Sequence, residues 1–349
     1  MTEHRPLSTI SRALLQRIPD LVDVASFRRP LQVVQIGGAG RRGGRVHFAV
    51  VDPSARPLLF ARLARDPRDS NVLIEEERLL RQLAAHPALQ PHLAALVGIV
   101  EIDGQPLLLE RAAPGEMMGR HLWMAALSRR LPADVAETLP ILVALGSATR
   151  RPLSPSDFDA QLLEPLRQCC RTLGGDSGRF DAIAASLQQQ LGAEPFAVLV
   201  HGDANPNNLL VEASSRRAWL IDWETAAPGL PLHDLMYFLS RYAYLGGVVP
   251  WGSKAARVRA FHGENHWAAV AARQAVRRYC EALSLPAATV LPLFQLHLLA
   301  KAALKWRTSG AERKTTRTWF ELYRHFAAHP PVLWRDFAAP GEVATTPQP

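Results

Sequence analysis

Residues 196–212 read FAVLVHGDANPNNLLVE, in which a polar loop separates two apolar runs of strand-like composition. After the turn at 214–216, the segment Trp219-Leu-Ile-Asp-Trp-Glu224 has the pattern of a further strand. We expect this strand to pair back on residues 208–212 as a hairpin. The pairing would bring Asp222 beside the loop that carries Asp203 and Asn208.

These three side chains suit a phosphate-transfer site. A carboxylate and an amide oxygen, Asp222 and Asn208, are ligands that a hard, octahedral Mg²⁺ carrying nucleotide phosphates accepts. The second carboxylate, Asp203, can then receive a proton from an attacking hydroxyl. The pattern therefore predicts a metal site and a general base in one place.

The motif extends on both sides and resembles a known family. His201-Gly-Asp203 with Asn208, then Ile221-Asp222-Trp-Glu224, then Gly229-Leu-Pro-Leu-His-Asp234-Leu are similar in order and spacing to the aminoglycoside phosphotransferase and choline kinase family. The resemblance implies Asp203 as catalytic base, with Asn208 and Asp222 holding Mg²⁺. It also implies that His201 braces the catalytic loop without transferring a proton and that Asp234 is structural. Glu224 is a further candidate contact to metal or substrate.

The resemblance also implies the fold class. It is α+β and protein-kinase-like, with a small antiparallel-sheet N-lobe containing one helix and a larger, mainly helical C-lobe. The sequence pattern agrees, with strands over 31–36, 45–51, 58–62 and 106–110 and a helix over 71–85. We expect a nucleotide-binding N-lobe at 30–113, a C-lobe at 114–338 and a disordered tail at 339–349.

Residues 1–29 form a predicted helical extension. Leu7, Ile10, Leu14 and Ile18 recur at helical spacing, with arginines between them. We expect a packed helix here, although the same pattern occurs in organelle transit helices.

The predicted nucleotide contacts lie in the N-lobe. The loop GGAGRRGG at 37–44 would cover phosphates through Gly38, Gly40 and Arg41, although a glycine-rich hairpin turn has the same composition. The family's strand lysine is absent, because no lysine precedes residue 254, and Arg62 is its positional match. We expect Glu76 to be the partner of Arg62. The stretch 107–115, with Glu110, resembles the hinge that binds adenine, and a plain strand-to-linker transition would look the same.

Composition excludes several classes of protein. The 349 residues are 48% hydrophobic and 21% charged, which is typical of a globular protein and not of a disordered, collagen-like or coiled-coil chain. The apolar run 282–300 contains two prolines, so we expect a loop and a buried helix rather than membrane insertion. Three cysteines without a CxxC pair indicate a reducing compartment, and we expect a cytoplasmic protein.

The net charge of +8 is spread along the chain, on 36 arginines and 4 lysines. We expect the basic residues of 301–327, which include Lys301 and Lys305, to form a solvated helix face. Trp306, Trp319 and Tyr323 have the helical spacing of core residues, so we expect no nucleic-acid partner.

These observations predict a Mg²⁺-dependent enzyme that transfers the γ-phosphate of ATP or GTP to a hydroxyl of a small molecule. The predicted C-lobe has five more basic than acidic residues, which favours a neutral or anionic acceptor over a polycationic aminoglycoside. The replacement of lysine by Arg62 supports an alternative, a nucleotide-binding pseudokinase that regulates a protein partner. A protein kinase is disfavoured because the gap between Asp222 and Asp234 is too short to dock a peptide.

Overall fold

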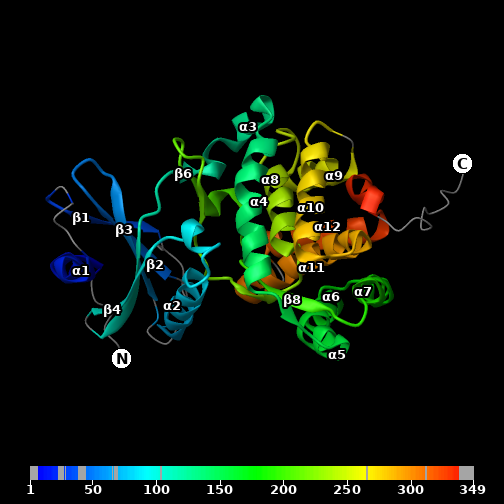
Figure 1. Cartoon of the computed structure of the whole chain (residues 1–349), viewed down its shortest axis with the longest axis horizontal. Helices are drawn as coiled ribbons and strands as arrows, with labels where there is room; N and C mark the ends of the chain where they lie inside the picture. The colour runs from blue at the N-terminus through cyan, green and yellow to red at the C-terminus, as the bar shows by residue number, and fades with distance from the viewer. Residues whose placement is uncertain are drawn as a thin grey trace, which may run out of the picture. The chain divides into compact units, whose positions relative to one another are not determined.

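The computed structural model describes residues 7–22, 27, 29–37, 45–64, 66, 70–102, 104–264, 266–310 and 313–337. The chain divides into two compact units, Met1–Gly115 and Glu116–Pro349 (Figure 1). The boundary predicted from the sequence was after residue 113. The predicted tail, residues 339–349, and the glycine loop with Gly38, Gly40 and Arg41 lie outside the described residues.

Among the described residues of the first unit, five strands form one antiparallel sheet in the order β1-β2-β3-β5-β4. They are β1 (Gln32–Gly37), β2 (Arg45–Val51), β3 (Pro57–Ala64), β4 (Leu96–Ile102) and β5 (Gln105–Arg111). The helices are α1 (Leu7–Leu21) and α2 (Ser70–Ala84). The strand β4 was not predicted from the sequence, because Gly98 interrupts its apolar run. The following Asp103-Gly104, a strong hairpin signal, could have revealed it.

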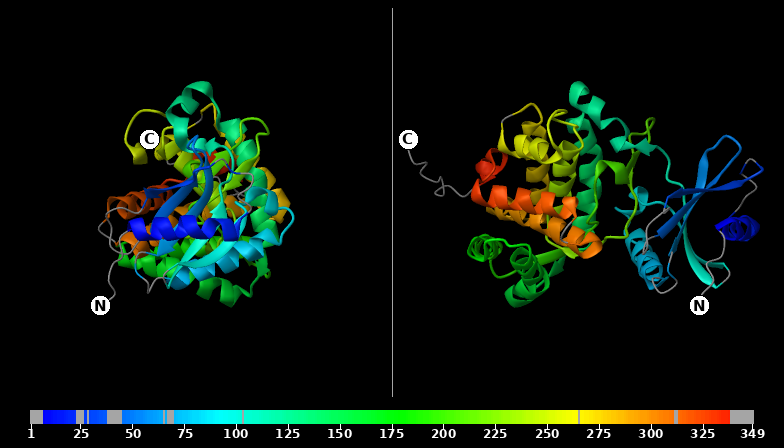
Figure 2. Two further views of the ribbon diagram at one scale, coloured as in Figure 1. Left: turned by 90° about the vertical axis from the view of Figure 1, so that its left-hand side faces the viewer. Right: turned by 180° about the vertical axis from the view of Figure 1, so that it is seen from behind.

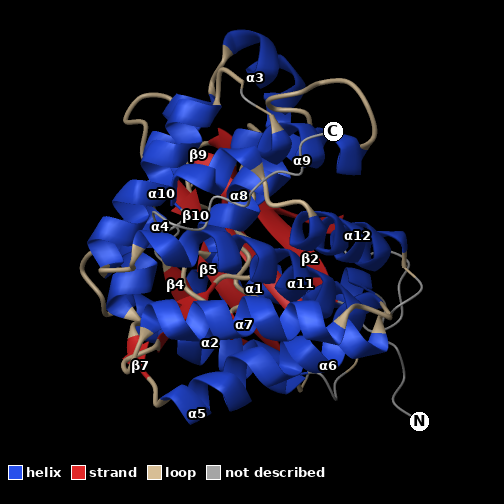
Figure 3. Cartoon of the chain, turned by 90° about the vertical axis from the view of Figure 1, so that its right-hand side faces the viewer, coloured by secondary structure: helices blue, strands red, loops and turns tan. Residues whose placement is uncertain are grey.

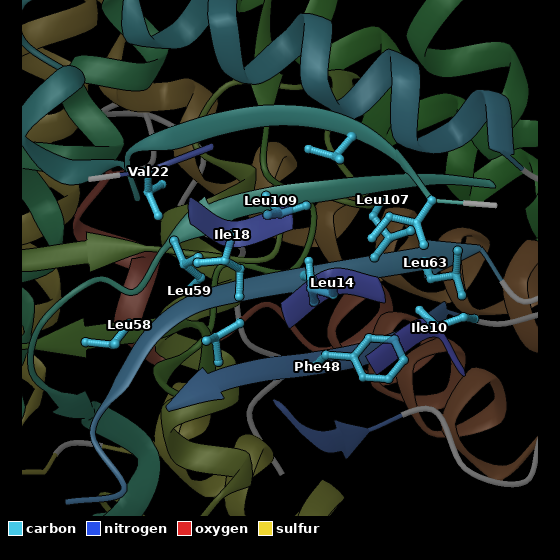
Figure 4. Close-up of a cluster of buried hydrophobic side chains, with 14 of the residues drawn as sticks. Ile10, Leu14, Ile18, Val22, Phe48, Leu58, Leu59, Leu63, Leu107 and Leu109 are labelled. Atoms are coloured by element: carbon cyan, nitrogen blue, oxygen red, sulfur yellow. The ribbon is translucent and has the colours of Figure 1, made fainter. Parts of the chain in front are cut away.

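The helix α1 covers one face of this sheet (Figures 2 and 4). Its buried residues Ile10, Leu14 and Ile18 pack with side chains from the strands in one hydrophobic cluster. Because side chains alternate along a strand, Leu59, Ala61 and Leu63 of β3 and Leu107 and Leu109 of β5 all point to this cluster. The expected N-terminal helix is therefore a packed part of the first unit.

The helix α2 lies on the opposite face of the sheet (Figure 2). The alternation that sends Ala61 and Leu109 to α1 sends Arg62 and Glu110 to the α2 side. These two residues come from neighbouring strands, because β3 pairs with β5 and Arg62 lies opposite Leu108. Two buried charged side chains are thus directed at α2.

The second unit is mainly helical (Figures 1 and 3). Its longer helices are α3 (Leu122–Ser128), α4 (Leu131–Ala148), α6 (Glu164–Thr172), α7 (Ser177–Leu191), α8 (His233–Tyr244), α9 (Lys254–Gly263), α10 (Ala269–Leu283), α11 (Val290–Ser309) and α12 (Lys314–Ala328). Short helical segments are η3 (Met118–His121), α5 (Pro155–Phe158), η5 (Pro206–Asn208) and η7 (Val332–Phe337). The two units confirm the predicted α+β, kinase-like architecture.

Short strands hold the loop that carries the motif. The strand β9 (Leu209–Val211) pairs with β10 (Ala218–Leu220), with Leu209 opposite Leu220, and also with β6 (Glu116–Met117). The strand β8 (Phe196–Val200) pairs with β7 (Arg151–Pro152) and β11 (Ala227–Gly229). The predicted pairing of the segment around 219 with the segment around 210 is therefore confirmed.

The helix α11 is a central element of the second unit and packs on α6, α7, α8 and α12. The segment Ala287–Thr308 and the helix Leu131–Ala148 are long and apolar enough to cross a membrane by length and composition. The most apolar window of the first is 72% buried inside the structure, and that of the second is 50% buried. This matches the buried helix expected after residue 282.

Candidate active site

The loop His201-Gly-Asp203 is held by hydrogen bonds to its backbone from several parts of the second unit. The buried Asp234 carboxylate accepts from the His201 amide at 2.7 Å and from the Gly202 amide at 3.0 Å. The Thr225 hydroxyl donates to the His201 carbonyl at 2.8 Å. Gly202 has φ +74°, and a Cβ there would meet the Thr225 carbonyl at 2.8 Å, so this position requires glycine. Asp234 thus holds the backbone of the loop, which agrees with the structural role expected of it.

The carboxylate of Asp203 lies at the centre of this site. Its Oδ1 accepts from Lys301 Nζ at 2.6 Å and from the Tyr237 hydroxyl at 2.9 Å. Its Oδ2 accepts from the amide nitrogens of Asn205 and Asn208, each at 3.2 Å. The same two amides hold the Asp203 carbonyl at 2.8 and 2.9 Å. The side chain keeps 26% of its surface exposed, so it is rigidly held and still accessible.

These contacts favour the ionised form of Asp203. Burial raises the pKa of Asp203, but the ammonium of Lys301, the charge of Lys305 and the Tyr237 hydroxyl together hold this pKa well below its usual range. Asp203 is therefore a carboxylate at neutral pH. A weakly basic carboxylate can orient a hydroxyl and receive its hydrogen bond before it takes the proton.

His201 is fully buried and has a bracing position. Its Nδ1 accepts from the Asp203 amide at 3.3 Å, so Nε2 carries the proton that points to the Ile221 carbonyl at 3.0 Å. The ring also packs edge-on against Trp223. Burial lowers the pKa of His201 to about 4, so the ring is neutral at pH 7. His201 joins the catalytic loop to the segment that ends in Asp222.

Asn208 and Asp222 are brought together by the β9–β10 hairpin. The Ile221 amide donates to the Asn208 carbonyl at 3.0 Å, so Asp222 follows directly beside Asn208. The Asn208 amide nitrogen donates to Asp203, which leaves its Oδ1 oxygen as a possible ligand. Asp222 has φ +69°, a conformation that is uncommon for non-glycine residues and concentrated at functional sites. One carboxylate and one amide oxygen suit a Mg²⁺ that takes its other ligands from phosphates and water. Glu224, the further candidate, is exposed.

The first unit contains a separate buried cluster of charges. Arg62 Nη1 lies 2.6 Å from Glu76 Oε1, which is the predicted pair. Arg62 also pairs with Glu110, and Glu76 pairs with Arg45. Arg62, Glu76 and Glu110 are each at most 9% exposed. Two arginines and two glutamates thus pair with one another in this cluster.

Glu110, which the sequence places in the predicted adenine-binding hinge, is engaged within the first unit. Its side chain is paired with Arg62, and its backbone lies in β5 between β3 and β4. The next two amides are also used within the sheet, with Arg111 donating to Ala95 and Ala112 to Leu58. Any adenine contact by a backbone amide would therefore come from residues after Ala112.

The sequence comparison decides the family. The family described as "Phosphotransferase enzyme family" matches residues 43–277, which is more than half of the chain and includes every motif residue from His201 to Asp234. This chain belongs to the phosphotransferase enzyme family. It is therefore a phosphotransferase, as predicted. No curated protein matches its sequence significantly.

Solved structures show the fold of this phosphotransferase. The GDP complex of aminoglycoside 2'-phosphotransferase-IIIa has a TM-score of 0.53 and 16% identity, covering 93% of this chain and 99% of that one. Plasmodium vivax ethanolamine kinase has a TM-score of 0.53 and 13% identity, covering 97% and 92%. Aminoglycoside-3'-phosphotransferase of type VIII has a TM-score of 0.50 and 17% identity, covering 86% and 99%. At such identities the similarity establishes the kinase-like fold and not the substrate.

Two residues at the phosphotransferase's catalytic loop were missed by the sequence analysis. Lys301 was expected on a solvated face, which is wrong, because its side chain is fully buried and paired with Asp203. Tyr237 was not singled out. A signal for Lys301 was present, since it interrupts the apolar run 290–304, and a buried lysine requires a partner. Trp319 and Tyr323 are buried as expected, whereas Trp306 is only partly buried.

Proposed function

We propose that this phosphotransferase moves the γ-phosphate of ATP or GTP to a hydroxyl group of a small molecule in a Mg²⁺-dependent reaction. The observation that carries the proposal is the assembly around Asp203, with an accessible, ionised carboxylate fixed beside Asn208 and Asp222. Phosphoryl transfer depends mainly on positioning and electrostatic stabilisation, and a rigidly held loop supplies the first.

Asp203 orients the acceptor. The acceptor hydroxyl donates its hydrogen bond to Asp203, its oxygen forms the new bond to the γ-phosphorus, and the bond from that phosphorus to the β,γ-bridging oxygen breaks. The nucleoside diphosphate leaves and the hydroxyl proton passes to Asp203. Asn208 and Asp222 would hold Mg²⁺, which neutralises phosphate charge when bound.

The charges near Asp203 support a neutral or anionic acceptor. Lys301 and Lys305 both act on Asp203, and Arg241 acts on Lys301. In the described part of the second unit, neither Lys305 nor Arg241 has a carboxylate within ion-pair distance. A polycationic acceptor would meet repulsion here, whereas a carboxylate or phosphate would be attracted.

A reducing, cytoplasmic location belongs to the same proposal. It is supported by Cys169, Cys170 and Cys280, which are the cysteines of the sequence and are all free and buried.

The experiment is a nucleotide-consumption assay with Mg²⁺ and three acceptor classes of similar size, namely neutral sugars, sugar phosphates and polycationic aminocyclitols. We expect turnover with a neutral or anionic class and none in Asp203→Asn. The control Asp181→Asn alters an exposed carboxylate that pairs with Arg167 and should keep wild-type turnover. Turnover confined to the polycationic class would contradict the acceptor assignment, and unchanged turnover in Asp203→Asn would contradict the assigned base.

A second candidate function rests on Arg62. Its guanidinium is already paired with Glu76 and Glu110, which favours a structural over a phosphate-binding role and supports a nucleotide-binding pseudokinase that regulates a protein partner. Nucleotide binding with no turnover on any acceptor class would favour this candidate.

A further inference from the structure

The side chain of Lys301 is fully buried, yet its ammonium group lies at the catalytic loop. Nζ donates to the Gly202 carbonyl at 2.7 Å and to Asp203 Oδ1 at 2.6 Å. It also lies 3.8 Å from the centre of the Tyr237 ring. An ammonium has three N–H donors, and these three contacts occupy its surroundings. Lys301 is therefore closed to substrate and can act only through the loop.

Tyr237 completes the arrangement on the same oxygen. Its ring lies beside Lys301 Nζ, while its hydroxyl donates to Asp203 Oδ1 at 2.9 Å. Oδ1 thus accepts from two strong donors, whereas Oδ2 has only the two longer bonds, at 3.2 Å, from Asn205 and Asn208. The geometry leaves Oδ2 as the better available acceptor for a substrate hydroxyl.

We propose that Lys301 is a positioning residue, which, together with Tyr237, holds Oδ1 of Asp203 and thereby aims Oδ2 at the acceptor hydroxyl. The functional part of this inference rests on the proposed function, because it assumes that Asp203 is the base. Lys301 reaches the loop from 98 residues away, out of a helix in the core of the second unit. A helix in the core of the second unit therefore fixes the position of the Asp203 carboxylate.

Lys301 interacts with several charged or titratable side chains. Asp203 is the carboxylate paired with it, and Tyr237, His233, Arg241 and Lys305 also act on this site. Burial lowers the pKa of His233 to about 3, so this ring is neutral. Removing either member of the Lys301–Asp203 pair leaves the other as a buried charge without its main counterion.

The test is a thermal-unfolding cycle with Lys301→Met, Asp203→Asn and the double variant, measured at pH 7. Methionine keeps the apolar stem and removes the charge. We expect each single variant to lower Tm at pH 7 by roughly 5 °C. The decrease in Tm of the double variant should be clearly smaller than the sum of the decreases in the two single variants. The matched control is Lys314→Met with Asp203→Asn. Lys314 is an exposed lysine outside the contacts of Asp203, so the losses of Tm in this pair of variants should add.

Kinetics separate positioning from packing. If Lys301 aims Asp203 at the acceptor, Lys301→Met should lower kcat by about tenfold or more and change the KM for nucleotide by less than about twofold. Lys314→Met, which alters an exposed lysine, should change neither. Additive losses of Tm in the cycle, or an unchanged kcat in Lys301→Met, would overturn the proposal. The cycle needs no turnover, so a protein that shows the coupling but transfers no phosphate would refute the proposed function and leave the ion pair established.

Discussion

The two units bury charged side chains in different ways. In the first unit Arg45, Glu76, Arg62 and Glu110 form buried ion pairs, and the side chains of the two glutamates are 3% and 11% exposed. In the second unit Asp203 is held by Lys301 and Tyr237 but keeps 26% exposure. A buried cluster of paired charges stabilises a sheet and a helix, whereas a fixed but accessible carboxylate can meet a substrate. The second unit therefore holds the candidate reactive group.

The largest effect should come from the accessible carboxylate. Asp203→Asn keeps the shape of the side chain and removes the proton acceptor, so we expect turnover to fall by about 10³-fold. Nucleotide binding, measured by calorimetry, should persist because Asn208 and Asp222 are unchanged. Loss of nucleotide binding together with turnover would assign Asp203 to the metal site instead.

The buried charge cluster of the first unit should lose stability when Glu76 is changed. Glu76→Gln leaves Arg45 and Arg62 without the carboxylate that joins them, and we expect the free energy of unfolding to fall by about 3–5 kcal/mol. Glu77→Gln is the matched control, because Glu77 pairs with Arg81, whose side chain is 62% exposed, and should cost under about 1 kcal/mol. Denaturant unfolding measures both. Equal losses in the two variants would show that the buried cluster has no special importance.

A smaller effect should follow from Arg62→Lys, which restores the family's usual residue. A lysine has one compact ammonium and cannot reach two carboxylates in the forked manner of a guanidinium, so we expect a loss of about 1–3 kcal/mol of unfolding free energy. Denaturant unfolding measures this loss, and a calorimetric titration compares the nucleotide affinity of the two proteins. A more stable Arg62→Lys protein would contradict the forked role of Arg62.

The smallest change is expected from pH. Burial lowers the pKa of Lys301 to about 8, and Asp203 opposes this shift. The charged form is needed to hold Asp203, so turnover should fall about twofold as pH rises from 7 to 8 and further above it, while nucleotide binding stays constant. A rate that is flat between pH 7 and 9 would show that the charge of Lys301 does not limit the reaction.

The contacts between residues close in sequence could be predicted. The spacing of His201, Asp203 and Asn208, and the hairpin that delivers Asp222, depend on local turn and strand chemistry that a sequence displays. The Arg62–Glu76 pair was also predicted, from the resemblance to the family's strand lysine and helix glutamate, with helical spacing selecting Glu76. These elements carry most of the fold and the centre of the site.

The contacts that were missed join distant parts of the chain. Lys301 and Tyr237 lie 98 and 34 residues from Asp203, and Glu110 reaches Arg62 across 48 residues. Helical periodicity places Lys301 on a helix but does not show which loop the buried face meets. A buried charge in an apolar run indicates that a partner exists, and only the tertiary structure identifies it.

The most direct test of the central claim is the thermal stability of wild type and Asp222→Ala with and without Mg²⁺ and saturating ATP or GTP. At a hundred times its dissociation constant, a nucleotide should stabilise wild type by about 2.7 kcal/mol, a shift of a few degrees. We predict a Mg²⁺-dependent shift in wild type that disappears in Asp222→Ala, while the two proteins melt at similar temperatures without ligand. No shift with either nucleotide, or an equal shift in both proteins, would contradict the assignment of Asn208 and Asp222 to a metal–nucleotide site.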